Sequence, residues 1–269
     1  LGGIKDLEKK CLCAVSEKNL LADPLRLIRG LRLMAQHQFL MDDQTKSWIA
    51  SNKTSFLKVS PERIQSELQQ LVNAPYADEV IPLLQSLRLF GHLENKDTAK
   101  GINRAPSLEA AQLLTNNEKQ LALPLARLTY LLSDEGLNCL KFSRRTCKRC
   151  QVLRQWQQRN DGNSFESLSE DDRFQLHKDL ENDLPALMLD LPVSKQEIWL
   201  TRWRNASDTL FHPSPPLDGN IIQKTLDLPS GPEFGDLMRY LCQENAFGRL
   251  HNRDEAFKAA INWWHQKKP

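Results

Sequence analysis

The stretch from Leu20 to Arg32, LLADPLRLIRGLR, constrains the fold of this chain more than any other. Asp23 followed by Pro24 is typical of a helix start, because Asp caps free N–H groups and proline fits the first turn. Apolar residues then recur at helical spacing, at Leu21, Leu25, Ile28 and Leu31. The stretch therefore predicts an amphipathic helix that Asp23 caps.

A carboxylate and a guanidinium share the polar face of this expected helix. Asp23, Arg26 and Gly30 follow one another at intervals of about one turn. The carboxylate accepts hydrogen bonds and the guanidinium donates them, so the pair matches the amino group and ring nitrogen of cytosine or adenine. Uracil and guanine reverse that pattern and would leave buried polar groups unpaired. Alternatively, Asp23 is only a cap and Arg26 is solvated.

Length and charge set broad limits on the protein. At 269 residues, the chain is long enough for two or three helical subdomains with substantial cores. Its 36 basic and 34 acidic residues give a net charge of +2, so any affinity for nucleic acid must come from local patches. Six cysteines without a regular framework indicate a reducing compartment. No apolar run approaches the roughly 18 residues of a membrane span, and we expect a cytoplasmic protein without a membrane partner.

A basic segment runs from Lys141 to Arg159, with seven basic residues and no acidic one. Such a run can neutralise phosphates, although a solvated helix face is the simpler alternative. The segment also contains Cys147 and Cys150, but it lacks the further ligands that structural zinc needs, so we predict no metal site. The candidate RNA contacts are Lys141, Arg144, Arg145, Lys148 and Arg149.

Further helix signals cover the rest of the chain and predict an all-α fold. Leucines from Leu121 to Leu132 indicate one buried helix, closed by Asp134-Glu135-Gly136. Near the C-terminus, Gly231-Pro232 and Asn252 with Glu255 are typical of helix starts.

The motif Asp23-Pro-Leu-Arg26-Leu-Ile-Arg29-Gly-Leu-Arg32 resembles the nucleotide-selecting motif of class II tRNA nucleotidyltransferases and bacterial poly(A) polymerases. In that family an acidic pair followed by xxR opens the helix and recognises CTP or ATP. Here Ala22 occupies the first acidic position. The resemblance implies that Asp23, Arg26 and Arg29 bind the nucleotide and that Arg32 supports them.

Other segments extend this resemblance to about residue 260. Gly2-Gly3-Ile4-Lys5-Asp6-Leu7 is similar to the motif that joins the catalytic head to the neck, which implies a supporting hinge role for Gly2, Gly3 and Asp6. Ser60-Pro61-Glu62-Arg63-Ile64-Gln65-Ser66-Glu67-Leu68 resembles the S-x-E-R-I-x-x-E-L element. In the family its charged residues support the nucleotide-recognising helix, which implies that role for Glu62 and Arg63. An ordinary capped helix with surface charges remains the alternative.

The resemblance implies an elongated all-α neck, body and tail. We expect a head or hinge segment at 1–19, the nucleotide-recognising neck at 20–95, an RNA-binding body at 96–193 and a tRNA-binding tail at 194–269. The implied partners are tRNA or other RNA 3′ ends, and the implied substrates are CTP and/or ATP.

The catalytic head of the family is not recognisable in this sequence. We find no strand that bears a D-x-D, and Glu181-x-Asp183 falls in an expected helix, where the two carboxylates point apart. The head would bind Mg²⁺ and transfer the nucleotide. We therefore expect no catalytic residue here, and no nucleotide addition by this chain alone.

Two other interpretations of the sequence remain open. The chain could be a non-catalytic helical RNA-binding module, in which case the coding region upstream of Leu1 would encode no D-x-D. It could also be a helical protein-interaction scaffold. That interpretation explains the apolar helices but leaves the spacing of Asp23 and Arg26 accidental.

Overall fold

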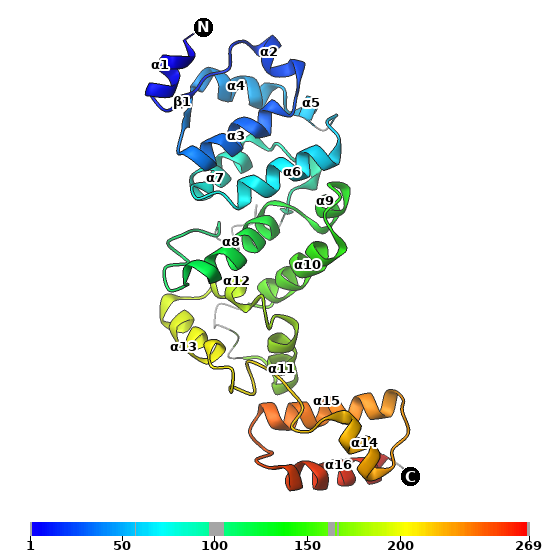
Figure 1. Cartoon of the computed structure of the whole chain (residues 1–269). Coiled ribbons are helices and arrows are strands. Elements are labelled where there is room, and N and C mark those ends of the chain that lie inside the picture. The colour runs from blue at the N-terminus through cyan, green and yellow to red at the C-terminus, as the bar shows by residue number, and fades with distance from the viewer. Residues whose placement is uncertain (1, 57, 97–104, 161–164, 166, 268–269) are drawn as a thin grey trace. The chain divides into compact units, whose positions relative to one another are not determined.

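The computed structural model of the chain consists almost entirely of helices, which confirms the all-α prediction (Figure 1). It describes residues 2–56, 58–96, 105–160, 165 and 167–267. The chain folds into two compact units. Unit 1 comprises Leu1–Gln158 and Pro185–Val193, and unit 2 comprises Arg159–Leu184 and Ser194–Pro269.

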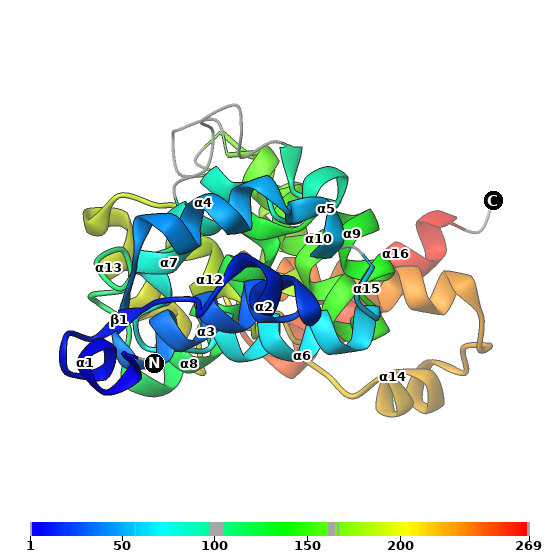
Figure 2. The same ribbon diagram turned by 90° about the horizontal axis from the view of Figure 1, so that it is seen from above.

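Unit 1 begins with short helices and a parallel ladder of two short strands. Strand β1 pairs with β2 so that Cys11 lies opposite Leu40 and Leu12 opposite Met41. The chain between the strands forms α2 and α3, and both views show α3 beside α6 (Figures 1 and 2). The first elements are α1 (Gly3–Glu8), β1 (Cys11–Leu12), α2 (Glu17–Ala22), α3 (Arg26–His37) and β2 (Leu40–Met41).

Helices α6 and α7 pack against α3 and bury its apolar face. Pro61 begins α6 as predicted, but the Ser60 side chain makes no capping hydrogen bond there. Leu25, Ile28 and Leu31 are buried, as the apolar spacing indicated, whereas Leu21 is only half-buried. Leu27, outside that pattern, is also completely buried. The elements here are α4 (Asp43–Ser51), α5 (Lys53–Phe56), α6 (Pro61–Val72), α7 (Ala77–Leu87) and the 3₁₀-helix η1 (Gly91–Leu93).

The second half of unit 1 differs from the expected single helix with a closing turn. Ser133 caps a new helix by accepting a hydrogen bond from Gly136 N, so Asp134-Glu135-Gly136 start a helix instead of ending one. Leu121, expected in the core, is 61% exposed. The elements are α8 (Asn116–Leu131), α9 (Asp134–Cys139), α10 (Arg144–Gln158) and α12 (Leu184–Met188), which leads back into unit 1.

Two close contacts hold α8 and α9 to the first half of unit 1. The buried Arg127 on α8 donates to the carbonyl of Val72 at 2.8 Å and pairs with Asp78 at 2.5 Å. A Cβ on Gly136 would lie 2.2 Å from the carbonyl oxygen of Leu93, so only glycine permits α9 to approach η1 this closely.

Unit 2 contains a small core formed by the three C-terminal helices. Gly231-Pro232 begins one of them as predicted, and the Asn252 side chain accepts from Glu255 N at 2.9 Å in the predicted cap. These three helices are α14 (Gly219–Leu226), α15 (Pro232–Ala246) and α16 (Arg253–Lys267). They follow α11 (Glu170–Asp179) and α13 (Val193–Arg204) in the chain. The core comprises Leu217, Ile222, Leu228, Leu237, Leu241, Ala256, Ala260 and Trp264.

A buried histidine lies among aromatic rings in the other part of unit 2. The ring of His177 lies 4.1 Å from that of Phe211 and 5.5 Å from that of Trp199. Its Nδ1 atom is buried and has no hydrogen-bond partner among the described residues. Burial, followed by the positive charge of Arg202, lowers the pKa of His177 to about 3, although Asp208 opposes this shift.

This depressed pKa predicts a loss of stability in acid. The folded protein keeps His177 neutral down to about pH 3, whereas the unfolded chain binds a proton below its ordinary pKa of 6.5. The free energy of unfolding should therefore fall from about pH 6.5 towards pH 3, by up to about 1.4 kcal/mol per pH unit for this group. Urea unfolding of wild type and His177→Phe at pH 7.5 and pH 5 measures it.

In that experiment His177→Phe should lose about 2 kcal/mol less than wild type between the two pH values. The exposed His92 serves as the control, and His92→Asn should behave like wild type. Equal losses in wild type and His177→Phe would contradict the assignment.

Candidate functional site

The corner between α2 and α3 differs from the predicted helix start. Asp23 is the C-cap of α2 with extended backbone (φ −137°), and α3 begins at Arg26 with Leu25 as its N-cap. Asp23 was therefore wrongly predicted as the N-cap of a helix that includes Pro24. The physical reason is that Arg26 N bonds to the carbonyl oxygen of Asp23 at 2.9 Å, so Pro24 and Leu25 form a turn and the helix begins only after it. The Asp23 side chain still accepts from Leu25 N, at 3.3 Å.

The carboxylate of Asp23 faces α6 across this corner. Arg63 Nη2 lies 3.2 Å from Asp23 Oδ2. The Arg63 side chain is 53% exposed and that of Asp23 is 30% exposed, so water screens the pair and it stabilises the fold by less than about 1 kcal/mol. The contact places Arg63 where the resemblance implies a supporting residue, whereas Glu62 is exposed on α6.

Arg26 is held from the other side, by α2. Its Nη1 atom donates to the carbonyl oxygen of Asn19 and, at 2.8 Å, to Asn19 Oδ1. The described contacts therefore connect Asp23 to α6 and Arg26 to α2, and they do not join the two side chains directly. Both partners of Arg26 are neutral, so these contacts leave its positive charge uncompensated.

A buried acid on α6 pairs with the next two arginines of α3. Glu67 Oε1 lies 2.9 Å from Arg29 Nη2, and Glu67 Oε2 lies 2.6 Å from Arg32 Nε. The Glu67 side chain is only 8% exposed. Glu67 thus joins Arg32 to α6, and the supporting role of Arg32 stays a prediction. Arg29 has a structural contact in addition to its predicted nucleotide contact.

Sequence reasoning included Glu67 only as a member of the S-x-E-R-I-x-x-E-L element, without a role of its own, and it did not name Asn19. Glu67 lies between Ile64 and Leu68 on the buried stripe of α6, and an acid in such a position usually requires a cationic partner. That signal could have identified it. Asn19 is an exposed residue in the first turn of α2, and the sequence gives no comparable indication of its contact with Arg26.

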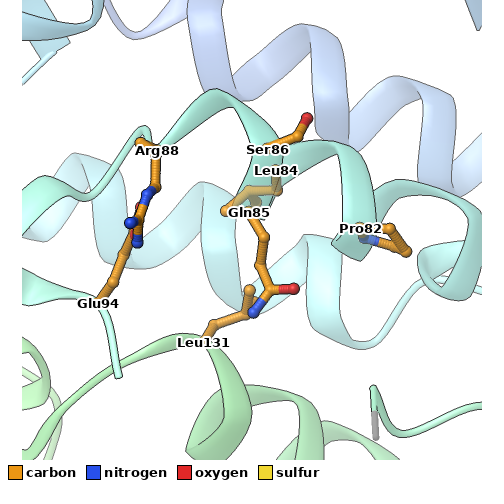
Figure 3. Close-up of a pocket in the computed structure, with 7 residues that line it drawn as sticks. All are labelled: Pro82, Leu84, Gln85, Ser86, Arg88, Glu94 and Leu131. Atoms are coloured by element: carbon orange, nitrogen blue, oxygen red, sulfur yellow. The ribbon is translucent and has the colours of Figure 1, made fainter. Parts of the chain in front are cut away.

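A pocket of about 320 Å³ opens near the end of α7 (Figure 3). Its two charged residues pair with each other, because Arg88 Nη1 lies 3.3 Å from Glu94 Oε2. None of the predicted site residues lines it. The lining residues are Pro82, Leu84, Gln85, Ser86, Arg88, Glu94 and Leu131.

The basic segment divides into an exposed part and a structural part. Four of the five candidate RNA contacts are exposed and Arg149 is half-buried: Lys141, Arg144, Arg145, Lys148 and Arg149. Arg154 instead is buried, pairs with Asp134 and donates to the carbonyl of Leu132 at 2.6 Å. Arg159 pairs with Asp172 at 2.8 Å. Apart from Arg159, which is exposed but paired with Asp172, the exposed basic side chains of the segment therefore lie at the start of α10 and in the turn before it.

The two cysteines of this segment differ in their exposure, and Cys147 is half-buried. Cys150 is completely buried, and burial raises its pKa to about 11. Within the described residues, no group of three or more His, Cys, Asp or Glu side chains is placed to hold a metal ion. Glu181 and Asp183 lie in a turn after α11, which corrects the expectation that they belong to a helix.

The predicted hinge residues belong to α1. Gly2 is its N-cap with φ −72°, and Gly3 begins the helix. Asp6 is half-buried on the same helix. Neither glycine adopts a left-handed conformation, so the hinge role stays a prediction. No helix among the described residues is long and apolar enough to span a membrane.

The Glu67 contacts predict how a substitution at this residue changes the stability of the fold. Glu67→Gln keeps the size of the side chain but leaves both arginines without its charge. The free energy of unfolding should fall by about 1–3 kcal/mol, mostly through Arg32, because solvent screens Arg29. Denaturant unfolding measures the change. On the same helix, the exposed Glu62→Gln should change stability by no more than about 0.5 kcal/mol, and equal effects of the two substitutions would contradict the assignment.

Comparisons with known proteins agree with this geometry. Residues 38–95 match the family described as "Probable RNA and SrmB- binding site of polymerase A". A CC-adding tRNA nucleotidyltransferase from Synechocystis is 23% identical over an alignment that covers 97% of this chain and 68% of that protein.

Solved structures share the fold. The CCA-adding enzyme of Bacillus stearothermophilus in complex with CTP has a TM-score of 0.69 and 20% identity, covering 100% of this chain and 69% of that one. The Thermotoga maritima CCA-adding enzyme complexed with tRNA has a TM-score of 0.67 and 13% identity, covering 97% and 66%. The chain thus spans about two thirds of each of these proteins. In sequence over 97% of its length, in the RNA-binding match and in fold, the chain is similar to the C-terminal portion of class II tRNA nucleotidyltransferases.

Proposed function

We propose that this chain selects the nucleotide and binds the tRNA in an enzyme that adds CMP and/or AMP to RNA 3′ ends. The observation that carries this proposal is the α2–α3 corner. There a carboxylate and a charge-bearing guanidinium are each fixed by a neighbouring helix, through Arg63 and Asn19. Relatives of the chain are CC-adding and CCA-adding enzymes.

Both side chains retain hydrogen-bonding capacity in this arrangement. A carboxylate has about four acceptor sites, and the described contacts of Asp23 involve only two donor groups, Leu25 N and Arg63 Nη2. A guanidinium carries about five N–H donors, and the described contacts of Arg26 involve only its Nη1 atom. Asp23 can therefore accept from the amino group of cytosine or adenine while Arg26 donates to the ring nitrogen.

The supporting contacts favour selectivity over simple attraction. Arg63 and Asn19 restrict the rotamers of Asp23 and Arg26, so a base with the reversed pattern cannot be accommodated by a small rotation. Glu67 pairs with both Arg29 and Arg32, which leaves Arg26 as the arginine of this face without a carboxylate in its described contacts.

The exposed surface at the start of α10 is suited to bind the RNA backbone. Four exposed basic side chains occur there within eight residues, Lys141, Arg144, Arg145 and Lys148, and clustered cations bind phosphates by releasing counterions. A tRNA complex is known for the Thermotoga maritima neighbour.

The chemical step requires residues that the described part of this chain does not offer. Nucleotidyl transfer uses carboxylates that hold metal ions beside the attacking hydroxyl, and no cluster of such ligands occurs among the described residues. The described residues therefore offer no set of carboxylates that could hold Mg²⁺. The proposal assigns Mg²⁺ binding to the catalytic head of the family.

Substitutions at the corner test nucleotide selection. In an enzyme that carries this chain together with a catalytic head, Asp23→Asn should lose about tenfold to a hundredfold in its preference for CTP or ATP over UTP and GTP. An amide donor then meets the base edge, and a mispaired edge costs roughly 1–3 kcal/mol. Arg26→Ala should depress the use of CTP and ATP. Competition among the four nucleotides measures both effects.

The structure offers a control for this experiment. Asn at position 23 can still accept from Leu25 N, so the corner should stay folded. Arg63→Gln removes the screened ion pair but no base contact, and it should reduce selectivity less than Asp23→Asn does. If wild type, Asp23→Asn and Arg26→Ala discriminate alike, the base is recognised elsewhere.

Another prediction from the proposed function concerns tRNA binding. Replacing Arg144, Arg145 and Lys148 by Ala should weaken tRNA binding and flatten its salt dependence, by about one unit of the log–log slope for each side chain that contacts a phosphate. Binding titrations at several salt concentrations measure this. The exposed Lys5, Lys9 and Lys18 provide a control with the same loss of charge. An unchanged slope in the α10 variant would mean that this surface faces solvent.

The third prediction concerns catalysis. This chain alone should add no CMP or AMP to a tRNA that lacks its 3′ end, even with saturating Mg²⁺, because its described residues lack the carboxylate cluster. Incorporation of labelled CTP and ATP tests this, and detectable addition would contradict it. RNA binding without any role in nucleotide selection in the head-containing enzyme would instead favour a non-catalytic RNA-binding module.

A further inference from the structure

Two thiols lie in contact at strand β1. Cys13 Sγ lies 3.7 Å from Cys11 Sγ and is placed to donate its S–H hydrogen to it. Neither cysteine is in a disulfide. The contact joins residues two positions apart, so it depends on the local extended backbone and not on distant packing.

The backbone at this point holds the two side chains on the same side of the chain. Extended chain rises about 3.3 Å per residue, which separates the Cα atoms of residues i and i+2 by about 6.6 Å and places their side chains on the same side. Disulfides bridge Cα atoms that are about 4.4–6.8 Å apart and Cβ atoms that are about 3.5–4.5 Å apart. Bond formation at Cys11 and Cys13 therefore requires rotation of the side chains and a local bend of the backbone, and Cys13 lies after the end of β1, where the ladder does not hold it.

Both sulfurs can be reached from solvent. Cys13 is exposed and Cys11 is partly exposed, whereas Cys150 and Cys242 are buried in the interior of their units. In this contact Cys13 is placed as the donor and Cys11 Sγ as the acceptor. Cys11 is thus suited to attack and Cys13 to complete the reaction.

We propose that Cys11 and Cys13 form a reversible disulfide by exchange with small-molecule disulfides of the glutathione class. Cys11 loses its proton to solvent, and the thiolate attacks one sulfur of the oxidant, forming a mixed disulfide and releasing one thiolate. Cys13 then loses its proton, attacks Cys11 Sγ and expels the second thiolate. Two protein thiols are oxidised, one disulfide is reduced to two thiols, and the released thiolates take up the two protons.

The site is adjacent to the nucleotide-recognising helix. Leu12, between the two cysteines, pairs with Met41 in the parallel ladder. A Cβ at Gly30 would lie 3.2 Å from Met41 Cε, so this methionine packs directly on α3. Oxidation would stiffen the strand that supports this contact.

Peptide mapping of the purified chain tests the proposal. The chain is equilibrated with a series of reduced and oxidised glutathione mixtures, free thiols are alkylated, and the protein is cleaved after lysine. One peptide, Cys11–Lys18, contains both cysteines. In oxidising mixtures it should become about 2 Da lighter than the reduced peptide and should take up no alkyl group, and added reductant should reverse this.

Single substitutions provide the control. Cys11→Ser and Cys13→Ser each lack one partner, so the remaining thiol should accumulate as a mixed disulfide with glutathione under conditions in which wild type forms the internal bond. Three outcomes would overturn the proposal: full alkylation of the wild-type peptide in oxidising mixtures, a stable mixed disulfide in wild type, or a bond to another cysteine such as the exposed Cys139. The wild-type result does not depend on whether the variants fold.

Discussion

The buried carboxylate of Glu67 determines how the helices around the corner fit together. It accepts hydrogen bonds from Arg29 and Arg32 of α3 while being carried by α6. Apolar contacts between two helices permit some sliding, because the hydrophobic effect has no direction. A charge pair with defined donor and acceptor atoms permits much less. Glu67 therefore fixes the position of α3 along α6, and with it the place at which α3 begins.

The corner before α3 directs the side chains of Asp23 and Arg26 to two different neighbouring helices. Pro24 keeps Asp23 extended, and this ends α2 and aims the Asp23 carboxylate at Arg63 on α6. Arg26, the first residue of α3, points back to Asn19. An uninterrupted helix would have placed Asp23 and Arg26 on one face with each free to choose its rotamer. The break supplies each side chain with a separate support.

Local signals predicted local structure well and distant contacts poorly. Pro61 and Pro232 begin helices where the proline and apolar spacing indicated. The Asp23-Pro24 pair misled because the same dipeptide suits a helix start and a turn after another helix, and Ser16 had already capped that earlier helix. The two partners of Glu67, Arg32 and Arg29, lie 35 and 38 residues away from it in the chain. One sequence contains no record of such a pairing, except that an acid occupied a buried position.

The two-residue ladder of β1 and β2 has a consequence for how this region opens. Leu40 N donates to the carbonyl of Lys10, and Asp42 N donates to that of Leu12. These bonds close a loop that contains all of α2 and α3, so the two ends of this segment stay together while the ladder is intact. The segment is therefore expected to unfold as one cooperative unit, with its backbone amides exchanging hydrogen with solvent together instead of fraying residue by residue. A two-residue pairing thus couples the opening of the two helices that the chain forms between its strands.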